Sequence, residues 1–148
     1  MNAHDAVIDA VLQALRAGQP LAGGRIDEEG SFDPMTSPEN EAISVEFIRS
    51  MPKEVLLSGH PVDWITQVRI SCLARSDGRT AAGRASRVLH AQVYQRLMAD
   101  PTLGGAVDLI EPPRLSSETA LIGSRMGVLH ADYTLQHRSD GATLEPQA

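Results

Sequence analysis

The sequence contains few cysteine, lysine and aromatic residues, and it has no long hydrophobic run. Its 148 residues include one cysteine, Cys72, so no disulfide can form within the chain. Aromatic residues make up only 3%. No apolar stretch approaches the ~20 residues that a membrane-spanning helix needs, and Asp5 and Asp9 near the start do not fit a secretory signal. We therefore expect no disulfide, no membrane insertion and no secretion.

The remaining composition is that of one globular domain. Hydrophobic residues make up 42% of the chain, which is too apolar for a disordered protein. The length is sufficient to bury one hydrophobic core but not two independent ones.

The net charge of −6 is unevenly distributed. The segment from Ile26 to Ile48 contains seven carboxylates and no basic residue, so the rest of the chain sums to +1. A second segment, from Arg75 to Arg96, contains five arginines against Asp77. The sequence therefore places an acidic stretch and a basic stretch at separate positions in one domain.

Two segments have the apolar spacing of amphipathic helices. From Ala3 to Ala17, apolar residues recur at intervals of three and four, with Asn2 or Asp5 as a start signal and Gly18 as a stop signal. A longer helix is expected from Gly78 to Ala99, capped by Asp77 and ended by Asp100-Pro101.

The intervening segments favour β-strands. Three consecutive strands are expected between the helices, and they predict an antiparallel meander with one covered face. After the second helix we expect two weak strands, of which the first ends at Pro112-Pro113 or lies at a sheet edge, and then a strong one. The long turn-rich segment from Gly18 to Asn40 allows one short strand near Gly24 to Asp27. The expected strands are Ala42 to Arg49, Pro52 to Ser58, Val62 to Ala74, Ala106 to Ile110, Thr119 to Ile122 and Gly127 to His137.

Together these patterns predict an α+β domain over residues 1–137. Its sheet is mostly antiparallel or mixed and is flanked by an N-terminal helix and a longer central helix. Residues 138–148 carry no pattern, and we expect a flexible C-terminal tail.

The sequence contains no constellation of catalytic or metal-binding residues. The acidic run that starts at Asp27 fails the calcium-loop register, because Phe32 stands where that loop needs glycine. The five histidines lack paired ligand spacing, which disfavours zinc. A nucleophilic pair of Cys72 and His90 is less favoured than a buried structural cysteine. No phosphate-binding glycine loop or nucleophile elbow is present, so we expect no enzyme activity, no cofactor and no metal.

Arg84 and Arg87 lie on one face of the second expected helix, with Arg79 and Arg96 beside it. A nucleic-acid surface usually combines such arginines with a basic total charge and stacking aromatics, which this chain lacks. Two readings remain, a solvated helix face and a contact with acidic residues of another subunit.

One part of the chain resembles a known family. The run from Ala91 to Gly105, with Met98-Ala99-Asp100-Pro101-Thr102-Leu103 at its centre, is similar to the helix and turn of phage tail terminator proteins. The run from Gly127 to His137 is similar to the last strand of that family, and the order of the remaining elements fits. The recognisable sequence is confined to Val88 to His137.

The resemblance implies a structural virion protein without catalytic residues. Members of this family form hexameric rings that cap the growing tail tube, end its polymerisation and offer a joining surface to the neck or connector. The implied partners are the chain itself, the major tail tube protein and the neck protein, with DNA passing through the pore without specific binding. The implied location is the top of the tail in the virion, and the host cytoplasm during assembly.

The residues suggest how such a ring could be held together. An acidic loop at the lumen would repel DNA phosphates, and acidic and basic patches on one subunit can meet head to tail. Other head–tail connector or tail-completion ring proteins fit the same layout, and an unrelated small-molecule-binding domain or hydrolase is the less favoured alternative. The candidate lumen or interface acids are Asp27, Glu28, Glu29 and Asp33, and the candidate inter-subunit bases are Arg79, Arg84 and Arg87.

Overall fold

The computed structural model describes residues 1–29, 40–54, 57–76, 79–122 and 124–147. Two helices and a five-stranded mixed sheet make up an α+β fold, as the sequence predicts. The sheet order is β1-β2-β3-β5-β4, in which β1 runs parallel to β2 and all other neighbours are antiparallel. The elements are α1 (Ala3–Arg16), the 3-10 turn η1 (Ala22–Gly24), β1 (Ile26–Glu28), β2 (Glu41–Pro52), β3 (Val62–Arg75), α2 (Ala82–Met98), β4 (Leu109–Ile122) and β5 (Ser124–Ser139).

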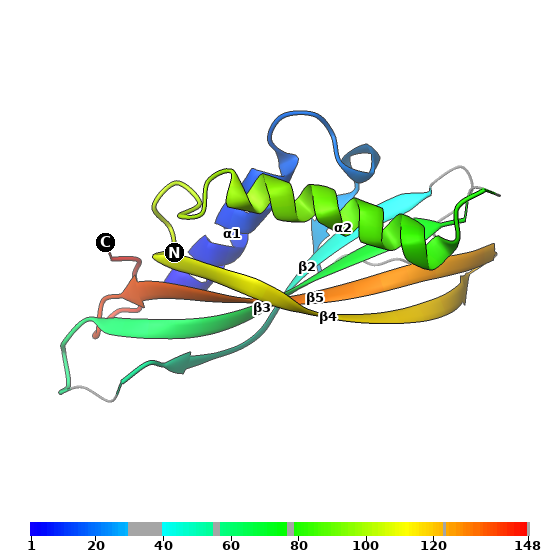
Figure 1. Ribbon diagram of the computed structural model, residues 1–148. Helices are drawn as coiled ribbons and strands as arrows, with labels where there is room; N and C mark the ends of the chain where they lie inside the picture. The colour runs from blue at the N-terminus through cyan, green and yellow to red at the C-terminus, as the bar shows by residue number, and fades with distance from the viewer. Residues whose placement is uncertain (30–39, 55–56, 77–78, 123, 148) are drawn as a thin grey trace.

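Both helices cover the same face of the sheet (Figure 1). The core lies between them and the inward side chains of β2, β3 and β5, where alternate residues such as Val68, Ile70 and Cys72 are fully buried. The inward set expected on the last strand, from Leu129 through Ala131 and Tyr133 to Leu135, is buried as predicted. No described helix covers the other face of the sheet, which we call the open face (Figure 1). At one end of this face, Ala42, Leu73, Met126 and Val128 nevertheless form a smaller buried cluster.

The first helix begins and ends where the sequence signals indicate. The side chain of Asn2 accepts a hydrogen bond from the backbone N–H of Asp5 at 2.8 Å, which satisfies one of the free donors of the first turn. Gly18 adopts a φ of 74°, the left-handed conformation that suits the residue after a helix.

The second helix starts later than predicted. It begins at Ala82 rather than Gly78, and Ala81 makes no side-chain cap, so the prediction of Asp77 as the N-cap is wrong; Asp77 and Gly78 themselves lie outside the described residues. Ala82, the first residue of the helix, is buried and lies close to Gly127 of β5.

Three of the expected strands differ from those in the structure. The strand expected at Pro52 to Ser58 is absent from the described part of that segment, because β2 continues to Pro52 and the chain then bends at Lys53 and Glu54. The expected strand from Ala106 to Ile110 and the one from Thr119 to Ile122 belong to a single strand, β4, which begins only at Leu109.

Tertiary position explains why β4 continues through two prolines. The strand lies at the edge of the sheet, where the missing N–H groups of Pro112 and Pro113 need no partner on the outer side. The register with β5 shifts between Glu111 and Arg114, so the prolines occupy a bulge.

The segment after His137 is hydrogen-bonded in the structure. Arg138 and Ser139 belong to β5, and Ser139 forms an isolated bridge with Pro146. The backbone N–H of Ala3, at the start of α1, donates to the carbonyl of Leu144 at 2.7 Å. The C-terminal segment therefore contacts the first turn of α1.

Candidate functional site

The acidic residues of the candidate site lie at the β1 edge of the sheet. Asp27 and Glu28 belong to β1 and are exposed, and Glu29 directly follows with a φ of 48°. Arg16 of α1 donates to the carbonyl of Ile26 from Nε at 3.1 Å and from Nη2 at 2.6 Å, and it lies 3.8 Å from Asp27. The fourth predicted acid, Asp33, lies outside the described residues.

The basic residues lie on the opposite side of the domain. Arg84 and Arg87 are exposed on α2, and Arg79 lies exposed in the segment before this helix. Arg114 of the edge strand β4 is also exposed, and it is not among the bases that the sequence predicted for an inter-subunit contact. Among the described residues, Arg84, Arg87 and Arg114 make no ion pair.

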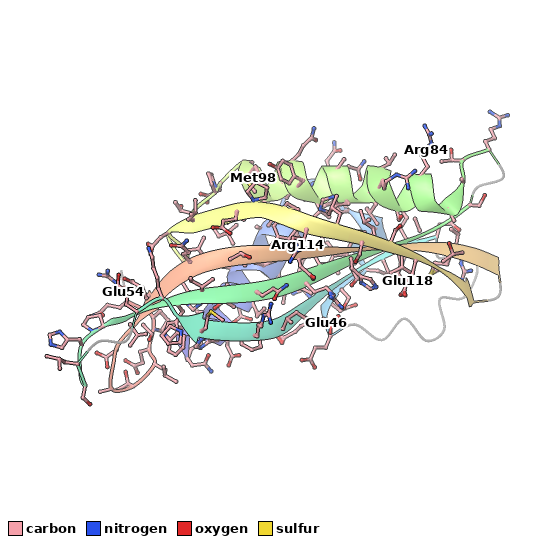
Figure 2. The ribbon with its side chains drawn as sticks, turned by 60° about the horizontal axis from the view of Figure 1, so that its bottom comes forward. Glu46, Glu54, Arg84, Met98, Arg114 and Glu118 are labelled. Atoms are coloured by element: carbon pink, nitrogen blue, oxygen red, sulfur yellow. The ribbon has the colours of Figure 1, made fainter. Side chains whose placement is uncertain are left out.

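The strand order separates the two charge groups by the width of the sheet. β1 and β4 are its two edges, and α2 packs on β3, β5 and β4 rather than on β1. Figure 2 shows Arg84 on α2 above the sheet, Arg114 of β4 near the middle of the view and Glu46 of β2 below it. The structure therefore does not bring the predicted acids and bases together within one copy of the chain.

The open face of the sheet carries a row of alternating charge across four strands. In the register of the sheet, Glu46 lies opposite Arg69, Arg69 opposite Asp132, and Asp132 opposite Arg114. Arg69 binds Asp132 through two contacts, at 2.8 and 3.2 Å. This hydrogen bonding raises the pKa of Arg69 above its ordinary value. The row ties the strands together without leaving a large net charge.

A neighbouring row contains a serine, a histidine and a glutamate in hydrogen-bonding order. Ser71 Oγ lies 2.8 Å from His130 Nδ1, and His130 Nε2 lies 3.1 Å from Glu118 Oε1. A hydrolase triad has similar contacts, but its serine must be accessible to a substrate. Ser71 is only 2% exposed, in the middle of a strand, so this row binds strands together and offers no nucleophile.

A second histidine cluster lies between the start of α1 and the sheet. His4 Nε2 lies 3.1 Å from Ser50 Oγ, which lies 2.8 Å from Thr66 Oγ1, which in turn lies 2.6 Å from His137 Nε2. The rings of His4 and His137 are 5.2 Å apart, edge to face. Burial lowers the pKa of His4, and it lowers the pKa of His137 to about 4. Both rings are therefore neutral near pH 7 and stabilise the packing of α1.

Cys72 is a core residue and not a nucleophile. It is fully buried on the inward face of β3, and burial raises the pKa of its thiol to about 12. His90 donates to or accepts from the Tyr133 hydroxyl at 2.8 Å, and burial lowers the pKa of this histidine. Among the described residues, His90 is therefore hydrogen-bonded to Tyr133 and not to Cys72.

Several shallow hollows lie on the described surface, and two of them are next to exposed apolar or acidic side chains. A shallow hollow of about 450 Å³ runs along the outer flank of α1 and is lined by Asp9, Leu12, Gln13, Arg16 and Ala17. A second one of about 260 Å³ lies at the end of the β2–β3 hairpin, next to Trp64 and the exposed Leu57. Neither has converging catalytic groups.

Within the described residues, no three of the side chains His, Cys, Asp and Glu gather closely enough to hold a metal ion. In the same part of the chain, no helix is both long and apolar enough to cross a membrane.

Comparison with known proteins gives no relative: no model of a protein family matches the chain, and no curated protein matches it.

The sequence pattern predicted the charged residues of α2 and β1 as site candidates, but not the polar row on the open face of the sheet. The serine, histidine and glutamate of the open-face row are far apart in the chain, and only the pairing of β3, β4 and β5 brings them together. Alternation along the expected strand from Val62 to Ala74 placed Ser71 on the outward face, but it carried no signal of its partners, and Glu118 lay outside the expected strands.

Proposed function

We propose that this chain is a subunit of a phage tail terminator: a homo-hexameric ring that caps the tail tube, ends tail polymerisation and provides the surface for joining the head. The resemblance of Ala91 to Gly105 and of Gly127 to His137 to that family motivates the proposal. The role requires binding surfaces and no catalytic group.

One structural observation carries the proposal furthest. Exposed acidic side chains lie on β1, at one edge of the sheet, and exposed arginines lie on α2, which packs over the other strands. A ring of identical subunits needs two different surfaces that complement each other on each copy, and opposite charges fix the register of such a contact. The exposed acids Asp27, Glu28 and Glu29 would lie at this contact or at the lumen, where they would repel DNA phosphates.

The proposed partners follow from this role. The ring contacts further copies of itself, the major tail tube protein on one side and the neck or connector protein on the other, while DNA passes through without specific binding. No membrane is involved. The ring acts in the host cytoplasm during assembly and remains at the head–tail junction of the virion.

A second candidate shares the ring geometry. Other head–tail connector and tail-completion proteins are also small α+β subunits with complementary edges, and the charge arrangement described above fits them equally. The two roles differ in what happens to the tail when the protein is missing.

The test is deletion of the gene from the phage or prophage that carries it, followed by electron microscopy of the lysate. A terminator is required to stop the tube, so tails of uncontrolled length without heads are expected, and supplying the protein in trans should restore normal length. Tails of normal length that merely lack heads would instead support the connector role, and unaffected virions would contradict both.

A second measurement addresses the ring itself. Negative-stain microscopy with mass determination should show six-fold rings of about 95 kDa, six copies of the 15.9 kDa chain, alone or on tail tubes. A protein that stays monomeric even with tail tubes present would count against the proposal.

A further inference from the structure

We infer that two copies of this chain pair through the free edge of β4, antiparallel and about a two-fold axis at Ser116, so that Arg114 of each copy lies opposite Glu118 of the other. This contact does not rest on the proposed function. A two-fold contact closes after two copies, whereas a ring needs two different surfaces on each copy. It also uses neither the acids of β1 nor the arginines of α2.

The outer edge of β4 is available to a further strand. β4 is the last strand of the described sheet, in which it pairs only with β5. Residues 114–119 of this strand are all exposed. An edge strand carries backbone N–H and C=O groups that have no partner within its own sheet. This stretch can therefore form hydrogen bonds with a second strand.

The features that usually prevent such pairing are confined to the first part of β4. Pro112 and Pro113 occupy the bulge between Glu111 and Arg114, and prolines and bulges hinder the addition of a strand to an edge. Residues 114–119 contain neither proline nor lysine, and their register with β5 has no further shift. The stretch that is open to a second strand therefore begins at Arg114.

The charges of this stretch determine the partner and its direction. Arg114, Ser116 and Glu118 all lie on the open face of the sheet. Arg114 makes no ion pair with a described residue, and it lies four residues from Glu118, about 13 Å along an extended strand. The two charges are equally distant from Ser116. An antiparallel second copy thus places an arginine opposite a glutamate twice in each dimer.

The same register continues the row of alternating charge across the open face. Within one copy the row passes from Arg69 through Asp132 to Arg114, where it ends on a positive charge. The next position in the dimer belongs to Glu118 of the second copy (Figure 2 labels Arg114 and Glu118). Glu118 contacts His130 at 3.1 Å through Oε1, but its side chain remains 62% exposed. Because a carboxylate accepts several hydrogen bonds, it has room for a guanidinium.

The other face of the same strand adds an apolar contact. Leu115 lies opposite Ala131, on the face that carries the helices, and it is 54% exposed. In the proposed register it lies opposite Ser117 of the second copy and diagonal to the second Leu115, at the ~7–8 Å at which long side chains still touch. Pairing therefore removes part of an exposed leucine from water.

Charge reversal tests the register. Arg114→Glu and Glu118→Arg each create two pairs of like charges in the dimer, so we expect either substitution to weaken dimerisation by about tenfold. The double variant, Arg114→Glu with Glu118→Arg, restores opposite charges in both pairs, and its affinity should lie within about threefold of the wild type. Glu111→Arg reverses a charge on the same strand before the bulge and should leave dimerisation unchanged.

The measurement is sedimentation equilibrium of the purified full chain up to its highest soluble concentration, because a contact of one strand pair is small and is expected to be weak. Circular dichroism of each variant checks that it is folded. A wild-type protein that stays monomeric would overturn the inference. A folded double variant that associates no better than the two single variants would also overturn it.

Cross-linking locates the axis independently. Ser116→Cys would place two cysteines directly opposite each other, with Cβ atoms about 4.5–5.5 Å apart, close to the separation that a disulfide spans. The matched control is Ser117→Cys, because residue 117 lies opposite Leu115 of the second copy and not opposite its own counterpart. Oxidation should link Ser116→Cys into covalent dimers and Ser117→Cys much less, while the native Cys72 is buried. Equal yields would contradict an axis at Ser116.

Discussion

At the residue scale, a cluster of buried polar side chains stabilises the packing of the N-terminal helix α1 on the sheet. His137 is 2% exposed, and its Nε2 contacts Thr66, whereas its Nδ1 has no hydrogen-bond partner among the described atoms. A protonated imidazole would bring a charge into this site, next to the ring of His4 and without a carboxylate partner of its own. The cluster is therefore stable only with both rings neutral.

This arrangement predicts a loss of stability on acidification. The pKa of His137 in the folded protein is about 4, below its ordinary value of 6.5. Between these values the unfolded chain binds a proton that the folded chain does not, so the free energy of unfolding falls as the pH decreases through this window. The same direction applies to His4 and His90, whose pKa values burial also lowers.

Urea unfolding between about pH 7 and pH 4 checks this prediction. His137→Gln should reduce the pH dependence of the unfolding free energy, each protein being compared with its own value at neutral pH. The matched control His60→Gln changes an exposed histidine and should keep the wild-type dependence. An unchanged slope in His137→Gln would contradict the assignment.

Gly127 decides how closely α2 approaches the sheet. A Cβ atom at this position would lie 2.3 Å from the carbonyl oxygen of Ala82 and 2.7 Å from the backbone nitrogen of Gly83. Both are backbone atoms that cannot rotate away, so Gly127→Ala must displace the start of α2. We expect a loss of about 1–3 kcal/mol in the free energy of unfolding.

Gly83→Ala is the control at the same junction. Its Cβ would contact only Arg87 Nη1, at an ordinary distance of 3.5 Å. Alanine is the better helix former, so this variant should be as stable as the wild type or about 0.5–1 kcal/mol more stable. Chemical denaturation of both variants checks the pair, and similar effects of the two substitutions would show that close approach is not the cause.

At the scale of elements, a single side chain joins the two helices. Arg96 of α2 donates to the carbonyls of Leu15 at 3.1 Å and Gln19 at 2.9 Å, and also to that of Ala17. These carbonyls lie at the end of α1, where the helix leaves its own acceptors unsatisfied. The guanidinium thus caps α1 and fixes it relative to α2.

Arg96→Met should remove these hydrogen bonds while retaining most of the side-chain volume. We expect a loss of about 1.5–3 kcal/mol in the free energy of unfolding, because the bonds come from a charged donor and several carbonyls lose their partner. Arg84→Met on the same helix is the control. It changes an exposed arginine without an ion pair among the described residues, and it should alter stability by less than about 0.5 kcal/mol. Denaturation at one dilute protein concentration measures both.

At the scale of the whole molecule, the fold places the acids of β1 and the arginines of α2 apart, which no single element could do. The acidic strand β1 and the basic helix α2 lie on different sides because the sheet order places β1 at one edge and α2 over the other strands. In the proposed ring, the exposed acids of β1 on one copy would associate with the exposed arginines of α2 on the next copy.

Salt should weaken this association. Raising the ionic strength from about 0.05 to about 0.5 M shortens the screening length to a few ångströms, so the proposed ring contact between the arginines of α2 and the acids of β1 should lose strength, by an amount visible as a shift to lower mass in sedimentation. Association that is insensitive to salt would contradict a contact held by these charges.

The sequence determined the elements with strong local signals. Helix α1, with its Asn2 cap and Gly18 stop, and the strand from Gly127 to His137, with its alternating apolar side chains, followed from periodicity and end signals. The α+β class followed from the order of these elements, whereas the placement of both helices on one face of the sheet did not. The candidate acids and bases likewise came from charge counts along the chain.

The tertiary structure alone decided where those elements end and what their charged faces meet. The start of α2 depends on contact with Gly127, and the continuation of β4 through Pro112-Pro113 depends on its edge position. Ser71, His130 and Glu118 became neighbours only because strand pairing brought β3, β5 and β4 together. Local propensity acts over a few neighbouring residues, whereas strand order is set by burial of the whole core. The sequence pattern therefore determined which charged residues are present, and the fold determined that the acids of β1 and the arginines of α2 lie apart.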